Sequence, residues 1–240
     1  MKLMELWDGL KNRREFFTHD DFMWYISPHL WTSLTEDSGT VSVATGAGGI
    51  LAIVTGATLD DEGAFATTNK PFLFAFEKPL LFEARIQLTE ASTNNAEPCI
   101  GFSSAMNSAD MMQDAKAGPA ASFSGAILYK TAGVTTWNFR VSIGTTNQDI
   151  ALREVVGDPS YHTYRIEIRE GSAGTGLLEA VPYRDGLQMM PLTGSPFGPP
   201  AKIAFAPTSA AAMQCGCYLK AASANAETLN VDYVSFGQLR

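Results

Sequence analysis

Leu229-Asn230-Val231-Asp232-Tyr233-Val234-Ser235-Phe236, close to the end of the chain, has the composition and alternation of a β-strand. Successive side chains of a strand point to opposite faces, which sorts these residues into two sets. One face carries Leu229, Val231, Tyr233 and Ser235, and the other carries Asn230, Asp232, Val234 and Phe236. A strand rich in β-branched and aromatic residues needs neighbours to pair with, so the stretch predicts that a sheet closes here.

Short strand patterns separated by turn signals fill most of the chain before this stretch. Residues 41–44 and 50–54 predict a hairpin across a glycine-rich turn. Residues 161–169 alternate most sharply, with Tyr164, Ile166 and Ile168 on one face and charged residues on the other. Such runs, with turns every 8–12 residues or so, are typical of a β-sandwich. We therefore predict one β-sandwich domain over residues 18–240, with the Pro/Gly-rich residues 191–200 as a loop inside it.

The segment at residues 105–117, between two predicted strands, does not have the alternation of a strand. Ser108 is placed to cap a short internal helix that carries Met111, Met112 and Ala115 and ends at Gly118-Pro119. Long excursions between strands often carry function. A helix that only plugs one edge of the sandwich is the alternative.

The first 17 residues form a segment of different character, predicted as an N-terminal arm or amphipathic helix. Apolar residues recur at helical spacing and are followed by the densest basic cluster of the chain. Either this segment caps the sandwich, or it docks on a partner through Leu3, Leu6, Trp7, Leu10, Lys11, Arg13 and Arg14.

The composition narrows the range of partners and compartments. The 240 residues include 17 Lys and Arg against 25 Asp and Glu, which gives a net charge of −8. Nucleic acids and anionic membrane surfaces are therefore not expected as partners. Residues 1–10 contain Glu5 and Asp8 where a secretory signal would be apolar, and the three cysteines make no disulfide framework, so we expect synthesis in a reducing cytosol. Cys215 and Cys217 share one face of a strand, and without enough further ligands for a metal they are expected, like Cys99, in the core.

The order of several short motifs along residues 19–236 resembles a known fold. The motifs are Asp20-Asp21-Phe22 followed by Trp31, Phe82-Glu83-Ala84-Arg85, Gly101-Phe102, Tyr161-His162-Thr163-Tyr164-Arg165-Ile166, Arg184-Asp185-Gly186 and Val231-Asp232-Tyr233-Val234. Together they resemble the concanavalin A-like jelly-roll sandwiches encoded by tailed bacteriophages as capsid decoration, or cement, proteins. The resemblance implies an all-β antiparallel sandwich in which the first strand lies next to the last. It also implies a homotrimer on the capsid exterior of a virion, made in the host cytoplasm, that stabilises the phage head by binding the major capsid protein.

The same resemblance implies a possible calcium site where the first and last strands meet. Asp232 matches the aspartate that such sandwiches contribute from the last strand, and Asp20 or Asp21 is placed to add oxygen ligands. The alternative is that Asp232 forms a hydrogen bond with a neighbouring turn.

Acids suited to glycoside hydrolysis are missing from the strand patterns. Retaining glycosidases of this fold need two carboxylates about 5–5.5 Å apart, as alternate positions of one strand provide. Glu83, Glu154 and Glu167 stand alone, Asp60-Asp61-Glu62 is adjacent and is interpreted as a solvated turn, and the histidines at 19, 29 and 162 are isolated. We therefore predict that the protein is not an enzyme. The alternative to capsid decoration is a carbohydrate-binding, lectin-like module that stacks sugars on Trp31, Trp137 and Tyr183.

Overall fold

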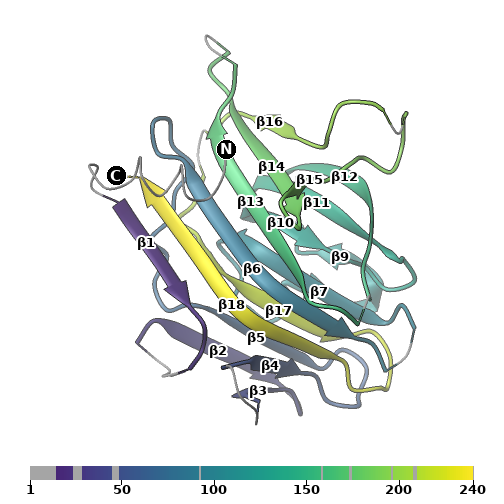
Figure 1. The fold of residues 1–240 in the computed structure, drawn as a ribbon. Helices are drawn as coiled ribbons and strands as arrows, with labels where there is room; N and C mark the ends of the chain where they lie inside the picture. Colours follow the sequence, from purple (N-terminus) through teal and green to yellow (C-terminus); the bar gives the residue numbers. More distant parts are fainter. Residues whose placement is uncertain are drawn as a thin grey trace.

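Two antiparallel β-sheets packed face to face make up the computed structural model (Figure 1). The structure describes residues 15–23, 29–44, 49–91, 93–157, 159–172, 175–195, 197–207 and 210–239. The predicted all-β antiparallel sandwich is confirmed. No helix in the described ranges has the length and apolar character needed to cross a membrane.

The nine-stranded sheet is the front layer in Figure 1. Its main path runs β15 (Leu187–Gln188), β14 (Leu178–Arg184), β13 (His162–Glu170), β6 (Leu80–Thr89), β18 (Thr228–Leu239), β4 (Leu51–Val54) and β3 (Thr40–Val43). β1 (Glu15–Asp20) also pairs with β18, and β16 (Ile203–Phe205) pairs with β14. The pairing of β3 with β4 confirms the predicted hairpin.

The seven-stranded sheet forms the second layer. Its order is β12 (Thr146–Val155), β11 (Thr136–Gly144), β10 (Phe123–Tyr129), β7 (Ala96–Ser103), β17 (Gln214–Ala221), β5 (Glu62–Thr67) and β2 (Trp31–Glu36). A separate small hairpin pairs β8 (Met112–Gln113) with β9 (Gly118–Pro119). This hairpin belongs to the connection between β7 and β10.

The first described strand lies beside the last, as the resemblance implied. β1 pairs with β18 from Glu15 opposite Leu239 to Asp20 opposite Val234, and Figure 1 shows the two strands side by side. The predicted boundary of the N-terminal arm at residue 17 is therefore too late, because residues 15–17 already belong to the sheet. The seven residues predicted to bind a partner, from Leu3 to Arg14, lie outside the described residues.

The last strand does not keep a single alternation along its length. A β-bulge between Val231 and Tyr233, relative to β6, inserts one extra residue. Val231 and Val234 are therefore both buried in the core, although the alternation predicted them on opposite faces. Tyr233 points outward instead, and its hydroxyl donates a hydrogen bond to Glu83 Oε1 at 3.0 Å.

The core lies between the two sheets and is rich in aromatic rings. Trp31 packs edge to face on Phe65 and on Phe236, which joins the seven-stranded sheet to the nine-stranded one. Trp137 packs on Tyr164 with ring centroids 5.0 Å apart. Edge-to-face aromatic pairs stabilise a core beyond the area that they bury.

The helix predicted within residues 105–117 is far shorter than expected. Only a single 3₁₀ turn, Asp114–Lys116, is helical, and it lies between β8 and β9. Ser108 begins no helix, because Met111 N donates only to the carbonyl of Ser108 in a tight turn. Met111 and Met112 are buried against a sheet instead, so tertiary packing overrides the local helical pattern.

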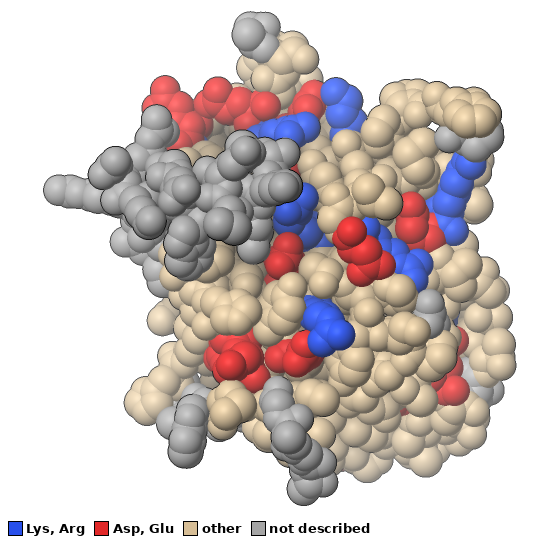
Figure 2. Space-filling view, viewed as in Figure 1, with Lys and Arg blue, Asp and Glu red and all other residues tan. Residues whose placement is uncertain are grey.

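The outer face of the nine-stranded sheet carries charged side chains of both signs. Figure 2 shows basic and acidic side chains interspersed over this face. Arg85 pairs with Asp232, and Arg165 lies 3.2 Å from Glu167. Burial and then the nearby Glu83 carboxylate raise the pKa of Tyr233 to about 12, so this phenol stays protonated as a donor. Arg85 and Arg165 on the described part of this face are therefore each close to a carboxylate.

Candidate functional site

The outer face of the central strands β5, β7, β10 and β17 of the seven-stranded sheet is covered, which is unusual for the solvent side of a sandwich. We call residues 104–122, between β7 and β10, the covering segment. Alternation places Cys215, Cys217 and Leu219 of β17 in the main core, whereas Tyr218 belongs to a second cluster. The sheet residues of that cluster pack against Met106, Met111 and Met112 of the covering segment. Strands that would otherwise have one face in contact with solvent are thus buried on both faces.

A buried lysine on β17 holds the covering segment in place. The Lys220 ammonium, fully buried, donates to Asp114 Oδ1 at 2.5 Å and to the Met112 carbonyl at 3.0 Å, both on the covering segment. It also donates to Glu62 Oε1 of β5 at 2.9 Å. Burial lowers the pKa of Lys220, but the hydrogen bonds to Asp114 and Glu62 outweigh this and raise it, so the ammonium remains charged.

Carboxylates outnumber the ammonium in this cluster. Asp110 Oδ1 lies 3.6 Å and Asp60 Oδ1 3.9 Å from Lys220 Nζ, so four carboxylates surround one positive charge. The backbone N–H of Asp110 donates to both oxygens of Glu62, each at 3.3 Å. Asp110 and Asp114 nevertheless keep 64% and 65% of their side chains exposed. They are therefore held from beneath while their remaining oxygens face solvent.

A row of charged residues crosses three neighbouring strands under this cluster. Lys220 faces Glu62 of β5 on one side and Glu97 of β7 on the other in the strand register. Burial raises the pKa of Glu62 and of Glu97, and nearby hydrogen bonds and Lys220 only partly oppose this. Glu97 Oε1 accepts from the N–H of Ala132 at 2.8 Å, while Glu97 Oε2 has no hydrogen-bond partner among the described residues. Clusters of buried groups with raised pKa are candidates for functional sites.

Arg140 of β11 contacts the covering segment at its other end. Its guanidinium binds Asp149 through both carboxylate oxygens, at 2.7 and 3.0 Å, and reaches the carbonyl of Pro119 at 3.5 Å. The Tyr129 hydroxyl donates to the same Asp149 at 2.9 Å. Polar groups therefore flank the covering segment on both sides.

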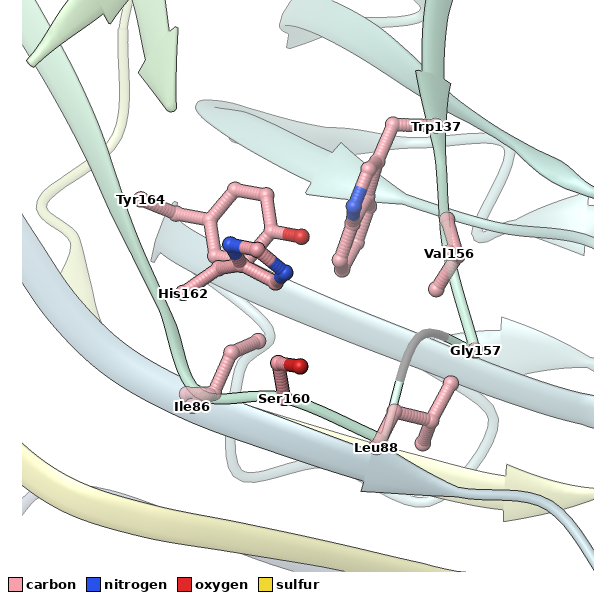
Figure 3. Close-up of a pocket in the computed structure, with 8 residues that line it drawn as sticks. All are labelled: Ile86, Leu88, Trp137, Val156, Gly157, Ser160, His162 and Tyr164. Atoms are coloured by element: carbon pink, nitrogen blue, oxygen red, sulfur yellow. The ribbon is translucent and has the colours of Figure 1, made fainter. Parts of the chain in front are cut away.

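A small pocket between the sheets is too narrow to hold a sugar. It is lined by residues of β6, β11, β13 and the connection before β13, and Figure 3 shows Trp137, His162 and Tyr164 pointing toward one another in it. Its volume of about 10 Å³ accommodates about one water molecule. Trp137 Nε1 has no hydrogen-bond partner among the described residues, so a single water is the occupant that this pocket suits.

The predicted calcium ligands are not brought together by the fold. Asp232 pairs with Arg85, and Asp20 accepts hydrogen bonds from Trp31 Nε1 at 2.6 Å and from Phe22 N at 2.8 Å. Asp21 accepts from Met23 N at 3.3 Å. Within the described ranges, the acids whose ligand atoms lie within 4.8 Å of one another are Glu62, Asp110 and Asp114. The Lys220 ammonium lies among those three, so their geometry does not suit a divalent ion while it is present.

Two of the three residues predicted to stack sugars are buried. Trp31 and Trp137 are each 1% exposed, which excludes contact between their rings and a ligand in solution. Both rings fill the inter-sheet core, the place that large aromatic residues most often take. Tyr183 does lie on an outward face, but the Arg165 guanidinium covers its ring at 4.3 Å and its hydroxyl donates to Glu167.

Other residues differ from their predicted setting. Asp60-Asp61-Glu62 is not a solvated turn, because Asp61 and Glu62 are 0% and 1% exposed. Lys220 and Glu97 were not predicted as site residues, although a charged side chain in an otherwise apolar strand was the available signal. The three cysteines are buried and free, as expected of core residues.

Comparison with known proteins identifies the fold. No protein-family model matches the chain, and no curated protein sequence matches it either. Among solved structures, peanut lectin is similar with a TM-score of 0.58 and 10% identity, over 93% of this chain and 97% of the lectin. An endo-1,3-β-glucanase from Streptomyces sioyaensis has a TM-score of 0.59 and 14% identity, over 93% and 96% of the two chains. The carbohydrate recognition domain of Emp46p, in a potassium-bound form, has a TM-score of 0.56 and 10% identity, over 90% and 94%. The chain therefore has the concanavalin A-like jelly-roll fold.

These similarities correct the prediction that the protein is not an enzyme. The glucanase and an endo-β-1,4-glucuronan lyase from Trichoderma reesei, with a TM-score of 0.56 and 10% identity, are enzymes built on this fold. At such low identity the likeness concerns the fold alone, and it gives no ground for excluding catalysis. None of the solved structures named here is a capsid or virion protein, so that role stays a prediction.

Proposed function

We propose that the protein is a carbohydrate-recognition domain that binds a sugar beside the covering segment. The observation that carries the proposal is the pair of outward carboxylates, Asp110 and Asp114, anchored from beneath by the buried Lys220 ammonium. Carboxylate oxygens are strong acceptors for sugar hydroxyls. Acceptors that are already held in place lose little conformational entropy when a ligand binds. The lectins and recognition domains that share the fold support the same class of ligand.

The charge of the site favours uncharged sugars. Four carboxylates surround one ammonium, and the whole chain carries a net charge of −8. Uronic acids and sulfated sugars would be repelled by such a surface. We therefore propose neutral oligosaccharides as the ligand class.

An array of neutral and acidic glycans, followed by calorimetric titration, tests this proposal. Replacing Asp110 and Asp114 by Asn is expected to weaken binding about tenfold or more, because each substitution exchanges a charged hydrogen bond for a weaker neutral one. Asp37→Asn is the matched control, since Asp37 is exposed and has φ 56° where Asp110 has φ 60°. Unchanged affinity in the double variant, or no bound glycan, contradicts the proposal. Mass spectrometry of the recovered glycan separates binding, in which it stays intact, from cleavage.

Capsid decoration is a second candidate function, proposed from the sequence resemblance. Exposed apolar side chains in β15 and in the connection from β15 to β16 support a role in assembly, since Leu187, Leu192 and Phe197 are 76%, 49% and 96% exposed. The proposed partner is the major capsid protein, the proposed assembly is a homotrimer, and the proposed location is the exterior of the virion.

Sedimentation of the full chain, alone and with capsid shells, tests the capsid role. Deleting residues 1–14 leaves β1 intact and removes all seven residues predicted to bind a partner, so this variant is expected to bind shells less tightly. A chain that stays monomeric and does not sediment with shells would refute the role.

A further inference from the structure

Five oxygen atoms surround the Lys220 ammonium. Asp114 Oδ1, Glu62 Oε1 and the Met112 carbonyl oxygen lie at 2.5, 2.9 and 3.0 Å. Asp110 Oδ1 and Asp60 Oδ1 follow at 3.6 and 3.9 Å. Carboxylates combined with a backbone carbonyl are the donors that calcium prefers in proteins. The set is thus one that would suit a hard cation, with an ammonium at its centre.

We propose that the Lys220 ammonium is a tethered cation that takes the place of a metal ion. An ammonium has three donor hydrogens, and three of the five oxygens lie at hydrogen-bond distance from it. The ammonium is covalently attached to a fully buried side chain, so this cation cannot leave the site by dissociation. A divalent ion that entered the same space would be repelled by the ammonium at close range.

The tethered cation holds the covering segment on the sheet without a metal ion taken from solution. Two of its bonding partners, Asp114 and Met112, belong to the covering segment, and the third, Glu62, belongs to the sheet beneath. We therefore expect chelators and divalent ions to leave the wild-type segment unchanged. This role of Lys220 is independent of whether the protein binds a sugar.

Removing the ammonium should convert the cluster into a calcium site. In Lys220→Ala, four carboxylates and one carbonyl would line the vacated space with no positive charge among them. The melting temperature of this variant is expected to rise with the logarithm of the calcium concentration, as for any ligand that binds only the folded state. Lys130→Ala is the matched control. Lys130 is equally buried, but its ammonium bonds one carboxylate, Glu90, and the Ala96 carbonyl. We expect no calcium response from it.

The experiment measures melting temperature and hydrogen exchange of the covering segment, with calcium and with chelator. A calcium-dependent rise in Lys220→Ala alone supports the proposal. Should that variant fail to fold without metal, it is refolded with and without calcium, and recovery that requires calcium also supports the proposal. Equal behaviour of Lys220→Ala with and without calcium would overturn it. Calcium binding by the wild-type protein that disappears in Glu62→Gln would overturn it as well.

Discussion

Lys220 Nζ lies 2.9 Å from Glu62 Oε1, and the two residues face each other directly across β17 and β5. Both side chains point to the outer face of the sheet, which solvent would normally reach. The covering segment excludes that solvent, so the pair behaves as a buried ion pair. The strength of the Lys220–Glu62 ion pair therefore depends on the covering segment staying in place over it.

We expect Lys220→Met to lower the free energy of unfolding by about 3–5 kcal/mol, because it leaves the Glu62 carboxylate buried without its partner. Glu62→Gln alone should cost less, since its amide retains a hydrogen-bond acceptor for the ammonium. The double variant should lose less free energy of unfolding than the two single variants lose together. Urea unfolding of the four proteins measures the coupling, and simple additivity would contradict the pairing.

The free energy of unfolding is expected to fall as the pH rises from mildly acidic to neutral, because Glu62 and Glu97 lose their protons. The pKa of each is raised in the folded state by burial, so the folded protein holds more protons than the unfolded chain between the two pKa values. Under that condition the free energy of unfolding decreases with increasing pH. Urea unfolding between about pH 4.5 and 7.5 measures the slope. Glu97→Gln should flatten it, and a slope that Glu97→Gln leaves unaltered would contradict the assignment.

Trp137→Ala is expected to destabilise the protein by about 3–5 kcal/mol without changing sugar affinity. The ring is 1% exposed and packs on Tyr164, so its loss opens a core cavity and removes no surface contact. Thermal unfolding and glycan titration of the folded variant check the two parts separately. Trp137→Phe, which keeps an aromatic ring, serves as the milder control. A large loss of sugar affinity with unchanged stability would place Trp137 in the binding site after all.

The thiols should be unreactive until the chain unfolds. Cys99, Cys215 and Cys217 are all buried, and burial raises the pKa of each thiol above its ordinary value. Because the thiolate is the reactive form, a thiol reagent should modify none of the three in the native protein and all three in denaturant. Rapid labelling of the native protein would contradict this prediction, because it would show that the reagent reaches at least one of the buried thiols.

The alternation in residues 161–169 predicted burial correctly for each core residue. Tyr164, Ile166 and Ile168 are in the core, while Arg165 and Glu167 pair on the outer face. The order of motifs also predicted the sandwich and the pairing of its first and last strands. The burial pattern depends on local periodicity, which the chain displays directly. The pairing of the first and last strands was implied by the resemblance to concanavalin A-like sandwiches.

Other features were mispredicted because they depend on contacts between distant residues. The bulge beside Val231 is set by pairing with β6, so the simple alternation wrongly placed Val231 and Val234 on opposite faces. The pattern at 105–117 suggested a helix, yet Met111 and Met112 gain more from packing on the sheet than from a helical turn. Trp31 and Trp137 showed aromatic character in sequence but not whether a ring faces a ligand or the core.

The stretch at residues 229–236 is a feature that the sequence alone could predict, whereas the cluster around Lys220 is not. By itself the sequence determined that this stretch is a strand, that the fold is an all-β sandwich, and that the chain carries a net negative charge. Only the tertiary structure decided that the solvent side of the other sheet is covered and that Lys220, Glu62 and Asp114 meet there. The physical reason is that alternation reports two faces of a strand but not what lies over each. Burial of the outer face depends on a segment that folds back over strands as far away in the chain as residue 220.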